Sequence, residues 1–157
     1  MPDVYKRQGQ GMKLLDYPDI LLRNMSPELL EKMNIEEKDG KLKVGVAKIV
    51  PACIMGSGLG ASTSYYGDYD ITLHDKKITE EYGLDKLRFG DIVAITDADT
   101  RFGRNFMTGA MTIGVVVHSD CILAGHGPGV TTLMTCKTPL IEAFIDENAN
   151  LADYFVR

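Results

Sequence analysis

Two apolar runs, residues 91–96 and 111–117, constrain the fold of this chain more than any other feature. The first is apolar or β-branched on both of its faces, which is typical of a strand covered on both sides. In the second, every odd-numbered position carries a large apolar side chain, as expected for a strand with one face in a core. Gly114, within the second run, leaves room for a neighbouring backbone or a ligand to approach closely.

Polar side chains follow both runs. Asp97 and Asp99 come after the first run, and His118 and Asp120 come after the second. Side chains two residues apart on an extended chain point the same way, so Asp97 and Asp99 are expected to converge. An active site, if the protein has one, is therefore expected within Gly90–Val130.

Glycine-rich segments at 56–60 and 125–129 form a second class of candidate site. Such loops can turn backbone N–H groups toward an anion. The first segment lacks the Lys-Ser/Thr of a nucleotide-binding loop, and a plain connection between strands explains it as well. The candidate ligand-binding glycines are Gly58, Gly60, Gly125, Gly127 and Gly129.

Two arginines, Arg101 and Arg104, lie between the two apolar runs. They can form ion pairs with Asp97 and Asp99 that hold a hairpin loop. Alternatively, one of the two arginines binds a carboxylate or phosphate of a ligand, because the forked guanidinium group matches the geometry of such groups. The sequence leaves both interpretations open.

Length and composition place the chain among ordinary globular proteins. Its 157 residues, 45% hydrophobic and 25% charged, are expected to form one domain with a substantial core. The net charge of −5 argues against a nucleic-acid binder, which normally carries a basic face. No apolar run approaches the roughly 20 residues that cross a bilayer, so no membrane partner is expected.

Three cysteines, Cys53, Cys121 and Cys136, match no zinc-finger spacing and are interpreted as reduced thiols of a cytoplasmic protein. Cys53 and Cys136 have apolar surroundings typical of buried cysteine, and Cys121, next to Asp120, is a core residue, a ligand or a nucleophile. The first eight residues resemble translated adaptor sequence, so residues 1–8 are expected to be non-native and residues 9–157 to form the domain.

Local signals predict short helices around several strands. Ser26-Pro27 is typical of a helix start, and Asp39-Gly40 predicts a turn before a strand over 41–50. Further helices are expected over 77–82 and 148–155, and further strands over 131–135 and 141–145. The predicted fold class is α+β, mainly β: a β-sandwich or barrel-like pair of sheets with short peripheral helices.

Three segments, 56–71, 87–104 and 109–133, together resemble the C-terminal half of a family classed as domain-of-unknown-function family 4438. The similarity extends over nearly everything from Gly9 onward. It implies that the chain is the C-terminal half of a longer family protein. A missing N-terminal domain or a homo-oligomer is then expected as a partner.

A weaker resemblance, to the acetamidase/formamidase family of amide hydrolases, rests on the order of three segments. These are Gly67–Asp70, Gly90-Asp91 and residues 118–129. The sequence of the last segment differs from that of the corresponding segment in the acetamidase/formamidase family. The resemblance implies a mainly β fold with paired sheets and hydrolysis of an amide.

Two hypotheses of function follow. The first is a metal-dependent hydrolase of a small amide or related polar molecule, because imidazoles and carboxylates suit zinc, manganese or iron. Its candidate metal ligands are Asp68, Asp70, His118, Asp120 and His126, and its candidate catalytic residues are Asp97, Asp99, Arg104 and His118. The second is a non-catalytic anion- or nucleotide-binding or assembly domain, in which the glycine loops bind the ligand and Arg101 or Arg104 closes over it.

Overall fold

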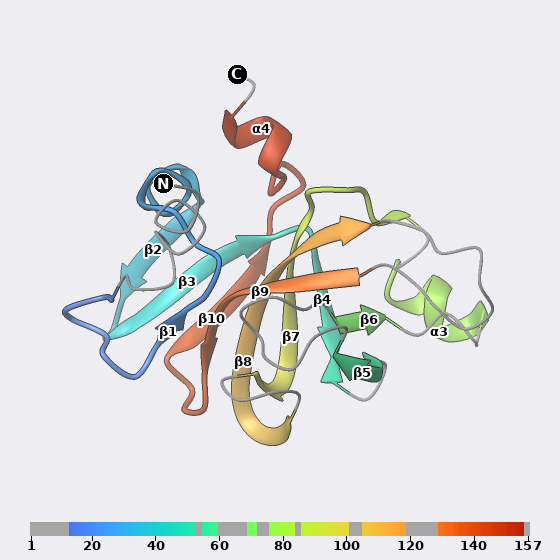
Figure 1. Cartoon of the computed structure of the whole chain (residues 1–157), viewed down its shortest axis with the longest axis horizontal. Coiled ribbons are helices and arrows are strands. Elements are labelled where there is room, and N and C mark those ends of the chain that lie inside the picture. Colours follow the sequence, from blue (N-terminus) through green and yellow to red (C-terminus); the bar gives the residue numbers. More distant parts are fainter. Residues whose placement is uncertain are drawn as a thin grey trace, which may run out of the picture.

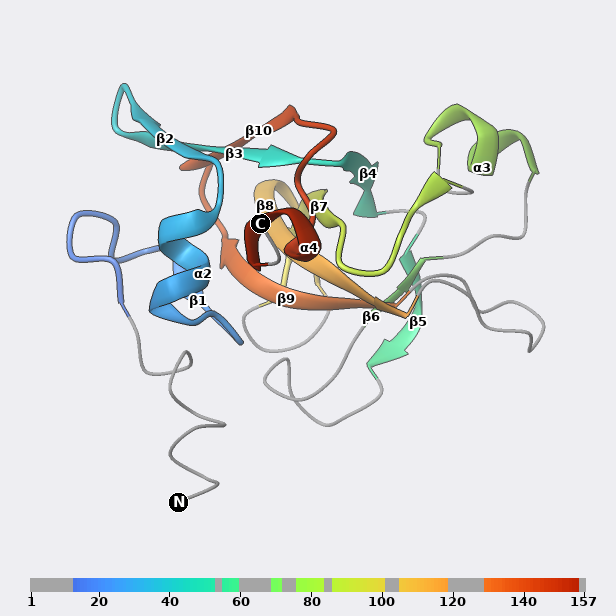
Figure 2. The ribbon, with the colours of Figure 1, turned by 90° about the horizontal axis from the view of Figure 1, so that it is seen from above.

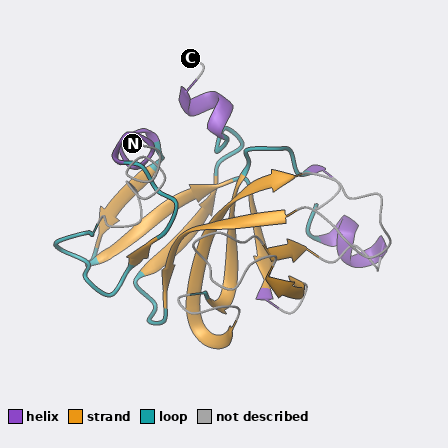
Figure 3. Cartoon of the chain, in the orientation of Figure 1, coloured by secondary structure: helices purple, strands orange, loops and turns teal. Residues whose placement is uncertain are grey.

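A computed structural model describes residues 13–52, 55–59, 69–71, 76–83, 86–100, 105–118 and 129–155 of the chain. Strands make up most of these residues and form two sheets, with short helices at their margins (Figure 1, Figure 3). The helices are α2 (Pro27–Lys32), α3 (Lys76–Glu81) and α4 (Leu151–Phe155). The predicted fold class, mainly β with sandwich-like sheets, is confirmed. In the part of the chain described, no helix is long and apolar enough to span a membrane.

The larger sheet has seven strands in the order β4-β7-β8-β9-β6-β5, with β1 beside β9. These strands are β1 (Leu21–Leu22), β4 (Lys48–Pro51), β5 (Met55–Leu59), β6 (Tyr69–Ile71), β7 (Ile92–Asp99), β8 (Asn105–His118) and β9 (Gly129–Cys136). The two apolar runs of the sequence are the paired centre of this sheet, β7 and β8. Only β4 and β7 run parallel; the other pairs are antiparallel.

The smaller sheet has the order β10-β3-β2, from β2 (Ile35–Lys38), β3 (Lys41–Val46) and β10 (Ile141–Ile145). The predicted turn joins β2 to β3, with Asp39 and Gly40 at φ 55° and 74°. The strand expected over 41–50 is two strands instead, because the chain changes sheets at Ala47. There the Ala47 N–H donates to the carbonyl of Ile92 in the other sheet.

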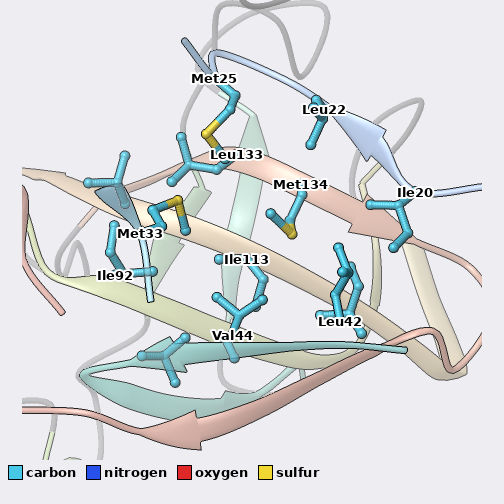
Figure 4. Packing of buried hydrophobic residues seen from close by; sticks show 14 of the residues in the cluster. Ile20, Leu22, Met25, Met33, Leu42, Val44, Ile92, Ile113, Leu133 and Met134 are labelled. Carbon is cyan, nitrogen blue, oxygen red and sulfur yellow. The ribbon is translucent and has the colours of Figure 1, made fainter. Parts of the chain in front are cut away.

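The main core lies between the two sheets. Leu42 and Val44 of β3 face Ile113 and Met134 of β8 and β9 (Figure 4), and all four side chains are at most 3% exposed. Burying one such side chain contributes about 1.5–3 kcal/mol to folding. The alternation of apolar side chains in residues 41–46 and 111–117 therefore determines which face of each sheet turns inward.

The helix predicted at Ser26-Pro27 is confirmed as α2, which covers one end of this core (Figure 2). Ser26 caps it, since its hydroxyl oxygen accepts a 3.1 Å hydrogen bond from the Leu29 N–H. Leu29 and Met33 bury their side chains in the core cluster.

The larger sheet is strongly curled. Strands β4 and β5 lie at its opposite edges, yet Pro51 and Met55 are separated by only three residues, which span at most about 14 Å. The two edges must therefore approach each other at this end. A second apolar cluster, which includes Val50, Val93 and Val116, packs on the face opposite to the main core.

The segment 56–60, predicted as a glycine loop, differs from that prediction. Residues Met55–Leu59 form β5, which pairs with β6 across an irregular register. Gly58 therefore lies in a strand with an irregular register and not in the loop that the sequence predicted, and its role as a ligand-binding glycine stays a prediction. Gly60 lies outside the described residues.

Candidate functional site

One row of backbone positions brings two predicted ligand residues together. Asp70 of β6 pairs with Gly129 of β9, and His118 of β8 pairs with the same Gly129 from the other side. Paired residues of antiparallel strands have Cα atoms about 5 Å apart, so Asp70 and His118 are about 10 Å apart across the row. The residue between them has no side chain. We call Asp70, Gly129 and His118 the three-strand row; of Asp70 and His118, only the main chain is described.

Two β-bulges between β8 and β9 set this row. The register shifts between Ile113 and Gly114, where β9 carries one extra residue, Leu133. It shifts back between Val116 and His118, where the extra residue, Val117, is on β8. Without the second bulge Gly129 would pair with Val117 rather than His118. Bulges are enriched next to functional sites, where they redirect a side chain.

Gly114 of β8 lies next to the first bulge and allows β9 to approach β8 closely. A Cβ atom at this position would fall on Cγ1 of Val130 and 2.8 Å from the carbonyl oxygen of Thr131. No real Cβ atom tolerates such a contact with main chain unless something moves. The expectation of a close approach at Gly114 is confirmed, and the neighbour is the backbone of β9.

Asp97 and Asp99 do not join this row, although the sequence predicted one site for all of these groups. Because β7 and β8 are antiparallel, the end of β7 lies beside the start of β8, and Asp99 pairs with Asn105. Thr96 pairs with Met111, from which about 20 Å of strand leads to His118. Polar residues that follow two consecutive antiparallel strands lie at opposite ends of the pair.

Asp97 has a structural role in an irregular part of the β7–β8 pair. It adopts φ 59°, and its carboxylate accepts a 2.9 Å hydrogen bond from the N–H of Gly109, which itself has φ 87°. Asp tolerates this left-handed conformation better than most residues. The expected convergence of Asp97 and Asp99 rested on a regular strand, and the left-handed conformation of Asp97, within the register irregularity between Thr96 and Ala98, removes that basis. Asp99 is only 3% exposed, whereas Asp97 is half-buried.

Four buried threonines connect β7, β8 and β9, and the sequence did not predict them. Thr112 donates to the carbonyl oxygen of Ala98 at 2.9 Å, so its oxygen accepts from Thr100 at 3.2 Å and Thr135 at 2.9 Å. Thr135 in turn accepts from the N–H of Thr100, and Thr132 donates to the hydroxyl of Thr100. Every hydroxyl proton of this threonine cluster thus has an acceptor, which satisfies polar groups that are at most 1% exposed.

Gly90 and Asp91 also have a structural explanation. Gly90 has φ 86° and packs against Asn150 just before α4. The buried carboxylate of Asp91 accepts hydrogen bonds from the Arg88 N–H at 2.8 Å and from Asn150 Nδ2 at 2.8 Å. Asn150 also donates to the carbonyl of Phe89 and accepts from the N–H of Ala152. This Asp91–Asn150 contact attaches the C-terminal helix to the start of β7.

Among residues whose side chains are described, no three His, Cys, Asp or Glu residues come together as a metal site. Cys136 is a buried thiol, 3.3 Å from the hydroxyl of Thr138, as its apolar surroundings predicted. The remaining candidates lie outside the described residues. They are Asp68, Arg101, Arg104, Asp120, Gly125, His126 and Gly127, together with Cys53 and Cys121.

The pKa of one tyrosine in α4, Tyr154, is shifted from its ordinary value. Burial raises the pKa of the Tyr154 hydroxyl, and the nearby carboxylates of Asp146 and Asp153 raise it further. The Asn34 backbone N–H lowers this pKa, although it does not reach hydrogen-bond geometry with the Tyr154 hydroxyl. Tyr154 therefore stays protonated at neutral pH and contributes packing to the main core.

Residues 32–155 match the family described as "Domain of unknown function (DUF4438), C-terminal". The chain belongs to this family. It is also similar to a solved structure described as "Crystal structure of TM1086", with 49% sequence identity and a TM-score of 0.83. That similarity covers 93% of this chain and 51% of the other, so the chain spans about half the length of that relative. No curated protein matches the chain.

The three segments that indicated the DUF4438 family have distinct places in the fold. Residues 56–71 contain all of β5 but its first residue, together with β6, and residues 87–104 contain Asp91 and the irregular end of β7. Residues 109–133 contain both bulges, Gly114 and two members of the three-strand row. The first and third segments therefore meet at this row, whereas the second supplies the structural contacts of Asp91 and Asp97.

Proposed function

We propose that the three-strand row is the centre of a divalent-metal site and that the chain is a hydrolase of a small amide or related polar molecule. The observation that supports the proposal is the pairing of Asp70 and His118 with the same glycine, with a bulge that selects His118 for this position. One carboxylate and one imidazole suit zinc, manganese or iron. A span of about 10 Å between their Cα atoms lets both side chains reach one ion.

Chain connectivity favours further ligands from the same region. Asp120 is two residues beyond His118, so their Cα atoms are within about 7 Å. His126 is three residues before Gly129, within about 11 Å of it by the same measure. Asp68 lies two residues before Asp70. Two of the five metal ligands proposed from the sequence, Asp70 and His118, are members of the row, and the other three are within three residues of a member along the chain.

A bound divalent ion would supply a water of lowered pKa and polarise a substrate carbonyl. The protein's own residues would hold and orient the reactants. Asp70 and His118 would hold the ion, and a carboxylate of Asp68 or Asp120 that does not bind the ion would accept a proton. Asp97 and Asp99 belong to β7 and lie beside the start of β8, too far from His118 at its end to take part, and the structural contact of Asp97 explains its presence.

The test is ammonia release from formamide, acetamide and similar short amides, measured with zinc, manganese or iron added. The metal-loaded wild type is expected to release ammonia, and Asp70→Asn to lower the rate at least about 100-fold, since it removes a ligand charge. Asp39→Asn is the matched control, because Asp39 is an exposed turn residue in the smaller sheet. Equal rates for the wild type and Asp70→Asn, or no release with any of the metals, would refute the proposal.

The second candidate is a non-catalytic assembly domain. Three large apolar side chains around α4 are exposed, Phe89 at 66%, Ile145 at 57% and Phe155 at 41%. Such side chains favour contact with another chain or domain, and the similar solved chain is about twice as long. This candidate requires no metal, so the metal measurements separate it from the first.

A further inference from the structure

We propose that Gly114 is a positioning residue for the three-strand row, a role that rests on the proposed metal site. Gly114 lies between the two bulges, in the segment where β8 and β9 are shifted by one residue. A single methyl group at this position would overlap Val130 and contact the Thr131 carbonyl oxygen. The close approach of β9 to β8 in this segment therefore depends on glycine at 114.

Val130, which a methyl group at 114 would displace, adjoins the row directly. Val130 is bonded to Gly129, and it pairs with Val116 on one side and Tyr69 on the other. Tyr69 in turn is bonded to Asp70. A shift of Val130 thus moves Gly129 and the neighbour of Asp70 together.

Val130 has little freedom to avoid this shift. Its side chain is 1% exposed and belongs to the second apolar cluster with Val93 and Val116. Turning it away would overpack that cluster, because protein interiors are close-packed. The Thr131 contact involves main chain, which no change of rotamer relieves. A methyl at 114 therefore moves the backbone of β9.

The experiment measures zinc affinity by titration calorimetry at a temperature at which circular dichroism shows each variant folded. Gly114→Ala is expected to weaken zinc binding roughly 10- to 100-fold, the range seen when supports of metal ligands are removed. Adding Val130→Ala removes the atom that the methyl overlaps, so the double variant is expected to regain part of the affinity. Rescue of this kind distinguishes positioning from general loss of stability.

Val44→Ala is the matched control, because it removes buried apolar volume from the smaller sheet, away from the row. It is expected to lower stability and leave zinc affinity unchanged. Zinc affinity of Gly114→Ala within about twofold of the wild type, or an equal loss in Val44→Ala, would overturn the role of Gly114 while the metal site stands. A wild type that binds no zinc would overturn both.

If Gly114→Ala does not fold, a second pair of variants can still be compared. Val130→Ala and the double variant differ only by the methyl at 114, which still lies 2.8 Å from the Thr131 oxygen. The double variant is expected to bind zinc several-fold more weakly than Val130→Ala. Equal affinities in this pair would also overturn the inference.

Discussion

Replacing Asp91 with alanine is expected to lower the free energy of unfolding by about 2–4 kcal/mol. The Asp91 side chain is buried and accepts hydrogen bonds from the main chain of Arg88 and from Asn150. Its removal leaves both donors without this acceptor, and each unmatched buried donor costs about 1–3 kcal/mol. The contact also holds α4, so the loss is expected in a cooperative urea transition.

Arg88→Ala is the control for the charged part of this contact. Its guanidinium lies 3.3 Å from Asp91, but the side chain is 62% exposed. Exposed ion pairs contribute about 0–1 kcal/mol, so this variant is expected to stay near the wild type. If Arg88→Ala cost as much as Asp91→Ala, the ion pair and not the buried hydrogen bonds would stabilise this end of β7.

The second large effect is expected for Thr112→Val, with a loss of about 2–4 kcal/mol in the free energy of unfolding. Valine has nearly the same shape, so the change tests hydrogen bonding rather than packing. It removes the donor to Ala98 and the acceptor for both Thr100 and Thr135, all within the sheet. Because these groups are buried, water cannot replace the lost partners at little cost.

Thr108→Val is the matched control in the same strand, β8. Thr108 is exposed, and the same change there is expected to alter stability by less than about 0.5 kcal/mol. Equal stability of Thr112→Val and the wild type in urea would show that the threonine cluster contributes nothing net. The cluster would then only fill space between β7, β8 and β9.

The sequence predicted much of the fold because the decisive signals are local. The alternation in 41–46 and 111–117 identified two core strands, and Ser26-Pro27 identified the start of α2. Asp39-Gly40 identified the turn of the smaller sheet. Each of these signals is contained within a few residues, so no knowledge of strand pairing was required.

Predictions that depend on strand pairing were less complete. Asp97 was expected near His118, but the antiparallel register places the two at opposite ends of the β7–β8 pair. The register also created the three-strand row, in which Asp70 and His118 meet at a glycine that is distant from Asp70 in sequence. Bulges such as that at Val117 depend on long-range packing, which periodicity within one strand does not reveal.

Buried polar contacts were missed for the same reason. Asp91 and Asn150 lie far apart in the sequence, and no local pattern connects them. The threonines of the cluster are typical strand residues, and their shared burial appears only once β7, β8 and β9 are paired.

The metal content of the purified chain tests the central claim most directly. After dialysis against zinc and then buffer, the wild type is expected to retain roughly one equivalent by plasma mass spectrometry, and Asp39→Asn the same amount. His118→Ala and Asp70→Ala, folded by circular dichroism, are each expected to retain almost none. A wild type without zinc, or full retention in both variants, would contradict a metal site at the three-strand row.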